Sequence, residues 1–412
     1  MPEQQAAGIV IAGAGHAGGS AAAFLRQYGW QGPITLVGEE ALPPYQRPPL
    51  SKAWLKGEAD GAGLALRPVA FYAKQDIALR LSTRILALDR AGQRLLLADG
   101  GAVPYDRLIL ALGASPRRLS LPGCALDGVL ELRTTLDADR IKAALGPGVR
   151  LAVIGGGYIG LEVAASARAL GAEAVVIERE ARVLARVASA ELSAYVTEQH
   201  RAQGVTILCG ADVEGLEGQA GRVAGIRLRD GALISCDVAL IGVGAVPNDG
   251  LAREAGLAVA GGILVDERAR TEDALIHAIG DCTVRPVPLY GRKLRLESVP
   301  NAIEQAKQAA ADLCGRAQPA PEVPWFWSDQ YVLRIQIAGL LHEVARTVAR
   351  RDPATGGVAF FHLAADGCVQ AVEAVSASAE FMAGRQMIAK RLPVAAEALA
   401  DPARAMRELI PS

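Results

Sequence analysis

Residues 151–165 read LAVIGGGYIGLEVAA, and residues 8–25 read GIVIAGAGHAGGSAAAFL. Both stretches open with a short apolar run, rich in β-branched residues, that is typical of a buried parallel strand. Both continue into the pattern G-x-G-x-x-G and then into a segment with helical character. Glycines at these positions allow a tight turn, the close approach of a pyrophosphate and close packing of helix on strand. The glycines of the two turns are Gly13, Gly15 and Gly18, and Gly155, Gly157 and Gly160.

Each unit goes on to a second strand that leads to an acidic residue. The strand in PITLVGEE is expected to end on Glu39, and the strand in AEAVVIERE on Glu178. An acid at this place accepts hydrogen bonds from a ribose hydroxyl. One G-x-G-x-x-G is weak evidence in a glycine-rich chain, but strand, turn, helix, strand and acid in this order, twice, is strong. The alternative is a pair of α/β packing turns that bind no ligand.

Two dinucleotide sites predict two dinucleotides. A bound flavin and a diffusible nicotinamide are the sensible pair, because a hydride passes between them. The glycines alone do not say which turn holds which dinucleotide.

The composition excludes several other classes of protein. The 412 residues include 43 basic and 44 acidic side chains without a long run of either sign, which argues against nucleic-acid or membrane-surface binding. Residues 8–25 form the only candidate membrane span, and their richness in glycine and alanine argues against a membrane helix. The six cysteines lie far apart and no histidines pair at metal spacing, so we expect no metal site and reduced thiols in a cytoplasmic protein.

Further stretches resemble a known family. YDRLILALGASPRRL (105–119) and ALIHAIGDC (274–282) resemble segments of flavoproteins with two dinucleotide-binding domains. YQRPPLSKAWL (45–55), RLESVPNAIEQA (295–306) and PWFWSDQY (324–331) resemble the NADH-dependent ferredoxin reductases of oxygenase systems. The resemblance covers nearly the whole chain.

The resemblance implies an α/β fold with two Rossmann-like domains, one inserted in the other. The FAD-binding domain would comprise 1–110 and 245–318, and the NAD-binding domain 111–244. A smaller α+β domain, 322–412, would follow the proline-rich linker RAQPAPEVP. Alternating apolar residues in EVARTVARRD and GVAFFHLAADGCVQAVEAV are typical of its strands.

The resemblance also implies roles for individual residues. In the first turn, FAD would be bound, its pyrophosphate facing Gly13, Gly15, Ala17 and Gly18. Glu39 would hold the adenosine ribose and Asp281 the ribityl chain. Trp327 would pack against the flavin and Trp325 would belong to the core, the alternative being that both tryptophans fill a domain interface. The remaining positions that match flavin-binding residues are Arg47, Ile85, Arg133 and the backbone of Val299.

Three charged residues would govern the chemistry. Lys52 matches a lysine beside the reacting edge of the flavin, where a cation stabilises the anion that forms as hydride arrives. Glu162 matches an acid near the nicotinamide and within reach of that lysine. The alternatives are a surface lysine at a helix start and a solvated acid in the first helical turn. Glu178 favours NADH over NADPH, although Arg179 and Arg186 soften that preference.

The implied activity is electron transfer from NADH through FAD to a small 2Fe–2S ferredoxin that feeds an oxygenase. Basic residues near the flavin edge would guide an acidic ferredoxin, and the candidates are Arg292, Lys293, Arg295 and Arg334. The alternative is that these are ordinary solvated surface charges. A disulfide reductase or thiol peroxidase is disfavoured, because residues 19–123 contain no cysteine. An NADH oxidase that reduces oxygen and a non-enzymatic NADH-responsive flavoprotein stay open as alternatives.

Overall fold

The computed structural model describes residues 8–410, which form two compact units. The first unit comprises residues 8–47, 61–115 and 246–324, and the second comprises 48–60, 116–245 and 325–410. A long segment of the second unit is thus inserted into the first. The first seven residues of the predicted FAD-binding domain and the last two of the predicted C-terminal domain lie outside the described residues. The predicted domain boundaries stay a prediction.

A parallel sheet forms the centre of the first unit. Its order is β19-β7-β1-β2-β3, and Ile9 of β1 pairs with Ile34 of β2 and with Arg107 of β7. All four residues of β1 are buried, as expected for a parallel strand covered on both faces. The strands are β1 (Ile9–Ala12), β2 (Ile34–Val37), β3 (Ile77–Arg80), β7 (Arg107–Leu110) and β19 (Ile276–Ala278).

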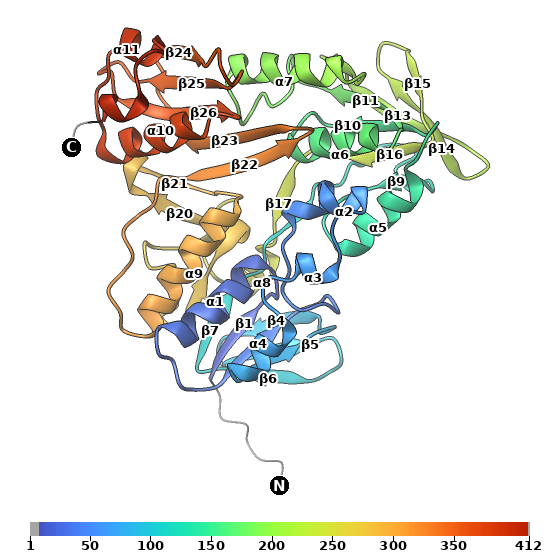
Figure 1. Cartoon of the computed structure of the whole chain (residues 1–412). Coiled ribbons are helices and arrows are strands. Elements are labelled where there is room, and N and C mark those ends of the chain that lie inside the picture. Colours follow the sequence, from blue (N-terminus) through green and yellow to red (C-terminus); the bar gives the residue numbers. More distant parts are fainter. Residues whose placement is uncertain (1–7, 411–412) are drawn as a thin grey trace. The chain divides into compact units, whose positions relative to one another are not determined.

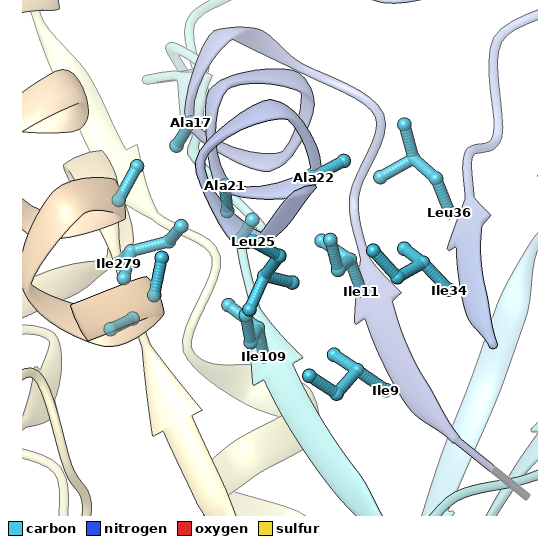
Figure 2. Close-up of a cluster of buried hydrophobic side chains, with 14 of the residues drawn as sticks. Ile9, Ile11, Ala17, Ala21, Ala22, Leu25, Ile34, Leu36, Ile109 and Ile279 are labelled. Atoms are coloured by element: carbon cyan, nitrogen blue, oxygen red, sulfur yellow. The ribbon is translucent and has the colours of Figure 1, made fainter. Parts of the chain in front are cut away.

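Two long helices, α1 (His16–Gln27) and α9 (Val299–Leu313), lie side by side over this sheet (Figure 1). Figure 2 shows Ile9, Ile11 and Ile109 of the sheet directed at Ala21 and Leu25 of α1. Small alanine side chains on both helices let them approach each other closely. The alternate residues of β1 join a second apolar cluster on the opposite face of the sheet.

The first unit also contains two small sheets and several short helices. One antiparallel sheet has the order β4-β5-β6, and another sheet has the order β18-β20-β21. Their strands are β4 (Ile85–Asp89), β5 (Arg94–Leu97), β6 (Ala102–Pro104), β18 (Ile263–Leu264), β20 (Thr283–Val287) and β21 (Arg292–Leu294). The short helices are α3 (Gly61–Leu64), α4 (Val69–Lys74), α8 (Gly250–Glu254), and the 3-10 turns η2 (Gly280–Cys282) and η3 (Pro288–Tyr290).

The second unit contains another five-stranded parallel sheet, in the order β12-β11-β10-β16-β9. Its strands are β9 (Val129–Leu130), β10 (Arg150–Ile154), β11 (Glu173–Glu178), β12 (Thr206–Cys209) and β16 (Val238–Ile241). The helices around it are α2 (Ala53–Lys56), α5 (Thr135–Ala144), α6 (Tyr158–Ala169) and α7 (Ala190–Ala202), with η1 (Pro48–Ser51) before α2. A three-stranded antiparallel sheet adds β13 (Val213–Gln219), β14 (Arg222–Leu228) and β15 (Leu233–Ser235). Strands β8 (Ala114–Pro116) and β17 (Ala245–Pro247) carry the chain across the unit boundaries.

The C-terminal part of this unit is a five-stranded antiparallel sheet with the order β22-β23-β26-β25-β24. Helix α10 (Ser378–Lys390) packs on β23 and β26, and α11 (Ala396–Ala400) lies beside β24 (Figure 1). The strands are β22 (Trp325–Gln330), β23 (Leu333–Gly339), β24 (Arg346–Arg351), β25 (Val358–Leu363) and β26 (Val369–Val375), and η4 (Met406–Leu409) follows α11. The strands predicted in EVARTVARRD and GVAFFHLAADGCVQAVEAV are present, and the predicted fold class is confirmed.

The second strand of the first unit ends earlier than predicted. Strand β2 stops at Val37, so Glu39 stands two residues beyond it. Val37 pairs with Ala12 and Arg80, the last residues of β1 and β3, so the neighbouring strands offer no partner beyond it. In the described residues, no helix is long and apolar enough to cross a membrane.

A buried carboxylate ties the C-terminal sheet to the parallel-sheet part of the second unit. Glu373 of β26 is fully buried and accepts hydrogen bonds from the backbone N–H of Ser189 at 2.9 Å and from its hydroxyl. His362 Nε2 lies 3.1 Å from the same carboxylate. Ser189 is also the N-cap of α7, so the start of this helix depends on the same contact.

We predict that Glu373→Ala destabilises the protein, because it leaves the donors of Ser189 and His362 buried without an acceptor. The expected loss is about 3 kcal/mol, since a buried unsatisfied donor costs ~1–3 kcal/mol. For a unit of this size, the melting temperature should fall by roughly 6–12 °C. Thermal unfolding followed by circular dichroism measures it. The matched control is Glu397→Ala, whose side chain is 78% exposed, and an equal loss in both variants would contradict the prediction.

Candidate functional site

The two glycine turns are built alike. Gly13 and Gly155 open them with φ of +116° and +109°, a region that favours glycine. A Cβ on Gly18 would lie 1.9 Å from the Gly13 carbonyl oxygen, and one on Gly160 would lie 2.4 Å from that of Gly155. The first turn of each helix therefore rests directly on the end of the preceding strand. Any side chain at the third glycine would separate the two.

The middle glycine of each turn faces open space. A Cβ on Gly15 or Gly157 would meet no atom within 4 Å, and each glycine is the N-cap of the helix that follows. Neither helix has a side-chain cap or an acid in its first turn, whereas α5, α7 and α9 are capped by hydroxyls of Thr134, Ser189 and Ser298. The N–H groups and positive dipole of α1 and α6 are thus left for an anion, which fits the phosphates of a dinucleotide.

The first residue of each of these helices carries a buried polar atom without a hydrogen-bond partner in the described residues. These atoms are His16 Nδ1 and the Tyr158 hydroxyl. Burial, and next the charge of Arg67, lowers the pKa of His16 to about 4, so its imidazole is neutral at pH 7. Burial raises the pKa of Tyr158 well above its usual value, with Glu373 and Glu162 adding to the shift. Neither residue was predicted from the sequence to have a role.

The acids after the second strands differ in how they are held. Glu178 is the last residue of β11, and its carboxylate accepts from the backbone N–H groups of Gly156 at 2.7 Å and Glu180 at 2.8 Å. Glu39 is exposed and lies 3.8 Å from Arg84 Nε. The neighbour of Glu178, Arg179, is 75% exposed and pairs with Glu180. Glu178 therefore has a fixed orientation beside the second glycine turn, and Glu39 does not.

A second segment of the first unit adjoins its glycine turn. A Cβ on Gly280 would lie 3.1 Å from the Cβ of Ala17, so the Gly280–Asp281 turn packs against the start of α1. The Gly280 N–H donates to Gln305 Oε1 at 2.8 Å, and Thr283 donates to the same oxygen. Gln305 is fully buried, and its Nε2 has no partner in the described residues. This cradle of glycines with orphaned donors fits a bound dinucleotide.

The other predicted flavin-binding residues are distributed over both units. Ile85 begins β4, and Val299 begins α9. Arg47 donates to Glu40 at 2.6 Å. Residues in the second unit are Arg133, just before the α5 cap, and Trp327 on β22. Trp325 of β22 is half-buried, with its ring centroid 5.8 Å from that of Phe381 and 5.2 Å from the Arg385 guanidinium.

Lys52 and Glu162 form an ion pair inside the second unit. The Lys52 ammonium lies 2.8 Å from Glu162 Oε2, and the two side chains are 15% and 6% exposed. Glu162 is on the buried face of α6 beyond its first turn, where an unpaired charge would be costly. Lys52 also donates to the Pro48 carbonyl at 3.0 Å. Glu162 is therefore not a solvated acid, and Lys52 is not an ordinary surface lysine.

Two serines donate hydrogen bonds to the Glu162 carboxylate, and neither was predicted from the sequence. Ser51 donates to Oε2 at 2.5 Å, and Ser328 donates to Oε1 at 2.6 Å. Both serines are buried. Ser166 in turn holds the Ser51 carbonyl at 2.7 Å, which fixes η1 against α6. The only sequence signal was that both serines lie within stretches that resemble the family, RPPLSK and PWFWSDQY.

Comparison with known proteins gives these features a context. The model of the family described as pyridine nucleotide-disulphide oxidoreductase matches residues 7–306, and the model described as reductase C-terminal matches residues 325–410. The chain belongs to the pyridine nucleotide-disulphide oxidoreductase family. It is therefore an oxidoreductase, and the predicted resemblance and enzyme class are confirmed.

Relatives within this family match over nearly the full length. The chain is 53% identical to the probable ferredoxin reductase CtmF of Castellaniella defragrans, covering 96% of each chain. It is 41% identical to the putidaredoxin reductase CamA of Pseudomonas putida, covering 98% of this chain and 96% of that one. A solved structure of the covalent putidaredoxin reductase–putidaredoxin complex matches with a TM-score of 0.95 at 40% identity, covering 98% of both chains.

The family is named for disulphide chemistry, so the state of the cysteines in this chain is relevant. All six cysteines, which lie within the described residues, are free. No group of three histidine, cysteine, aspartate or glutamate side chains in residues 8–410 is arranged to hold a metal ion.

Proposed function

We propose that this chain is an NADH-dependent ferredoxin reductase. It takes a hydride from NADH onto FAD and delivers single electrons to a small 2Fe–2S ferredoxin that feeds an oxygenase. The observation that supports this most is the repeated cradle, because a chain that builds the same anion-binding turn twice is suited to two dinucleotides. Relatives named as reductases of ferredoxin and putidaredoxin support the choice of partner.

The first turn would hold FAD and the second NADH. Gly13, Gly15, Ala17 and Gly18 would receive the FAD pyrophosphate, and Gly155, Gly157 and Gly160 that of NADH. Bound FAD accepts two electrons together and returns them one at a time, which a nicotinamide does not do. The adjoining Asp281 turn supports the flavin assignment, because it packs against the first turn and supplies a polar group for the ribityl chain.

The remaining assignments follow the positions of the side chains. Glu39, being exposed, is available for the adenosine ribose. Arg47, Ile85, Arg133, Val299 and Trp327 would complete the flavin site. Glu178 would accept from the 2′-hydroxyl of NADH and repel the 2′-phosphate of NADPH. Its fixed carboxylate supports this role.

Lys52 and Glu162 would act at the reacting edge of the flavin. A buried ammonium there stabilises the negative charge that develops as hydride arrives, and low exposure strengthens the interaction. Glu162 fixes the direction of the Lys52 side chain and balances its charge before reaction. Both residues would thus be needed for the hydride step rather than for holding either dinucleotide.

Among the basic residues predicted to dock an acidic ferredoxin, the exposed ones on β21 are better candidates than Arg295. Lys293 is exposed, whereas Arg295 is engaged by Glu297. Arg334 on β23 is also exposed. The six unpaired cysteines, spread over the chain, favour a reducing compartment, the cytoplasm.

The decisive experiment is NADH-driven reduction of cytochrome c by the purified flavoprotein, with and without a 2Fe–2S ferredoxin from the same organism. We expect a strong stimulation by ferredoxin, because the flavin needs a one-electron carrier to reach a distant acceptor. Oxygen uptake is recorded in parallel. Brisk oxygen uptake without stimulation by ferredoxin would contradict the proposal and favour an NADH oxidase.

A pair of glycine substitutions tests which turn holds which dinucleotide. Gly15→Ala and Gly157→Ala each add one methyl group that meets no protein atom, so both variants should fold. Gly15→Ala should be purified with little FAD, because the methyl group lies where the pyrophosphate approaches. Gly157→Ala should keep FAD but bind NADH about tenfold more weakly, about the cost of one displaced contact. Flavin absorbance and NADH titration measure these effects, and the reverse pattern would exchange the assignments.

Reversing the charge of Lys293 tests the docking surface. Lys293→Glu should raise the KM for ferredoxin by about threefold to tenfold, because attraction across an interface governs encounter. Reduction of a small neutral dye should be unchanged. The matched control is Lys74→Glu, an exposed lysine on α4 of the same unit. Equal effects of the two reversals, or equal effects on ferredoxin and dye, would exclude Lys293 from docking.

A further inference from the structure

A chain of hydrogen bonds links Glu162 to the turn between β22 and β23. Ser328 donates to Glu162 Oε1 at 2.6 Å, and Gln330 Nε2 donates to the Ser328 hydroxyl at 3.1 Å. His200 Nε2 lies 2.7 Å from Gln330 Oε1, and the Tyr331 hydroxyl lies 3.1 Å from His200 Nδ1. Ser328 and Gln330 are two residues apart on β22, so both side chains point to the same face of the strand.

The donors in this chain all point toward the carboxylate. Gln330 Oε1 can only accept, so His200 Nε2 carries the proton and Nδ1 accepts from Tyr331. Burial lowers the pKa of His200, which keeps the ring neutral as this arrangement requires. Hydrogen bonds arranged head to tail polarise one another, so each strengthens the next. The strongest member is then the one that Ser328 makes with the charge of Glu162.

The far end of the chain is held in a costly conformation. Gln330 pairs with Leu333, so Tyr331 and Val332 form a two-residue turn, and Tyr331 has a φ of +55°. This region is unfavourable for a residue with a side chain, and such turns usually use glycine or asparagine. The Tyr331 ring packs edge-on against His200 at 5.0 Å. The contact with His200 therefore holds the turn in place and fixes the register of β22.

We propose that Ser328 is a positioning residue for hydride transfer: through it, the C-terminal sheet holds Glu162, and Glu162 holds Lys52. The carboxylate has one anchor for each oxygen, Ser51 on Oε2 and Ser328 on Oε1. With only the Ser51 anchor, the carboxylate can rotate, and the ammonium that is 2.8 Å away moves with it. The inference rests on the proposed role of the Lys52–Glu162 pair in the hydride step.

The C-terminal segment would then do more than carry Arg334, a candidate docking residue. Residues 325–410 lie outside the match to the pyridine nucleotide-disulphide oxidoreductase model, yet one of their side chains completes the surroundings of Glu162. Ser328 touches neither dinucleotide in this scheme and acts only through Glu162. The distinction can be measured.

The test is anaerobic reduction of the bound flavin by NADH in a stopped-flow spectrometer, with the holoenzyme. Ser328→Ala should slow reduction at saturating NADH by about tenfold to hundredfold, because small misplacements of reacting groups have effects of this size. The Kd for NADH and the FAD content should stay within about twofold of the parent, since ground-state binding does not use the pair. The matched control is Ser193→Ala, which removes a hydroxyl that is equally buried, in the same unit, and donates to the Val183 carbonyl. Its reduction rate should be unchanged.

A double-mutant cycle separates positioning from a merely structural effect. In a Glu162→Gln background, Ser328→Ala should add little to the slowing, because the residue acts through that carboxylate. Gln330→Met, one step further along the chain, should give a smaller slowing with the same non-additivity. It also serves as the second variant if Ser328→Ala does not fold. Equal rates in Ser328→Ala and Ser193→Ala, or additive effects with Glu162→Gln, would overturn the inference.

Failure of the underlying proposal has a different signature. If Lys52→Ala and Glu162→Gln both reduce at the parent rate, the pair has no part in hydride transfer, and the inference falls with it. If those two variants are slow while Ser328→Ala is as fast as the parent, only the positioning role is lost.

Discussion

The structure depends most on a constraint at the third glycine of each turn, where helix and strand are separated by less than a side chain. Gly18 and Gly160 let their helices start directly against the carbonyl oxygens of Gly13 and Gly155. Because of this contact, the free ends of α1 and α6 are held at the carboxyl edge of a parallel sheet, where ligands of such folds bind. Both helices lack a capping side chain, so their N–H groups are satisfied by an anion or by water. An uncapped N-terminus makes each of these helices less stable by itself, but it leaves the N–H groups available to bind an anion.

Buried charges follow a common rule in this protein. Glu162, Glu304 and Glu373 are all about 5% exposed or less, and each has at least two donors. Glu304 is met by both amino groups of Arg285, and Glu373 by Ser189 and His362. Glu162 differs because its cation is a lysine, Lys52, which has a flexible side chain. Lys52 lies in residues 48–60, a short segment that belongs to the second unit although the residues on either side of it belong to the first. Hydroxyl groups hold the carboxylate in place, and the Lys52 ammonium contacts both this carboxylate and the Pro48 carbonyl.

The sequence was sufficient for features that depend on local patterns. The strands, the glycine turns and the helices after them follow from apolar periodicity and from the steric demands of a pyrophosphate, and they appear where predicted. The end of β2 was misplaced, because it depends on where the neighbouring strands β1 and β3 end, which no local pattern reveals. Ser51 and Ser328 were missed for a similar reason. They lie 111 and 166 residues from Glu162, and a serine in a strand or turn has no pattern that indicates its partner. The reach from Lys52 to Glu162 was expected only through the resemblance to a family.

The cysteines bear on how electrons would leave a bound flavin. Family members that reduce disulfides need a thiolate close to the flavin, and a thiolate needs a lowered pKa. Here burial raises the pKa of Cys236 and Cys282 to about 11, and Cys282 stands next to Asp281, the acid assigned to the flavin. The cysteine nearest to that assigned site is thus poorly suited to attack a disulfide. Cys236 and Cys282 therefore do not supply the low-pKa thiolate that disulfide reduction would use. In the proposed function the electron acceptor is instead a separate one-electron carrier, so specificity would depend on a docking surface rather than on a second reactive side chain.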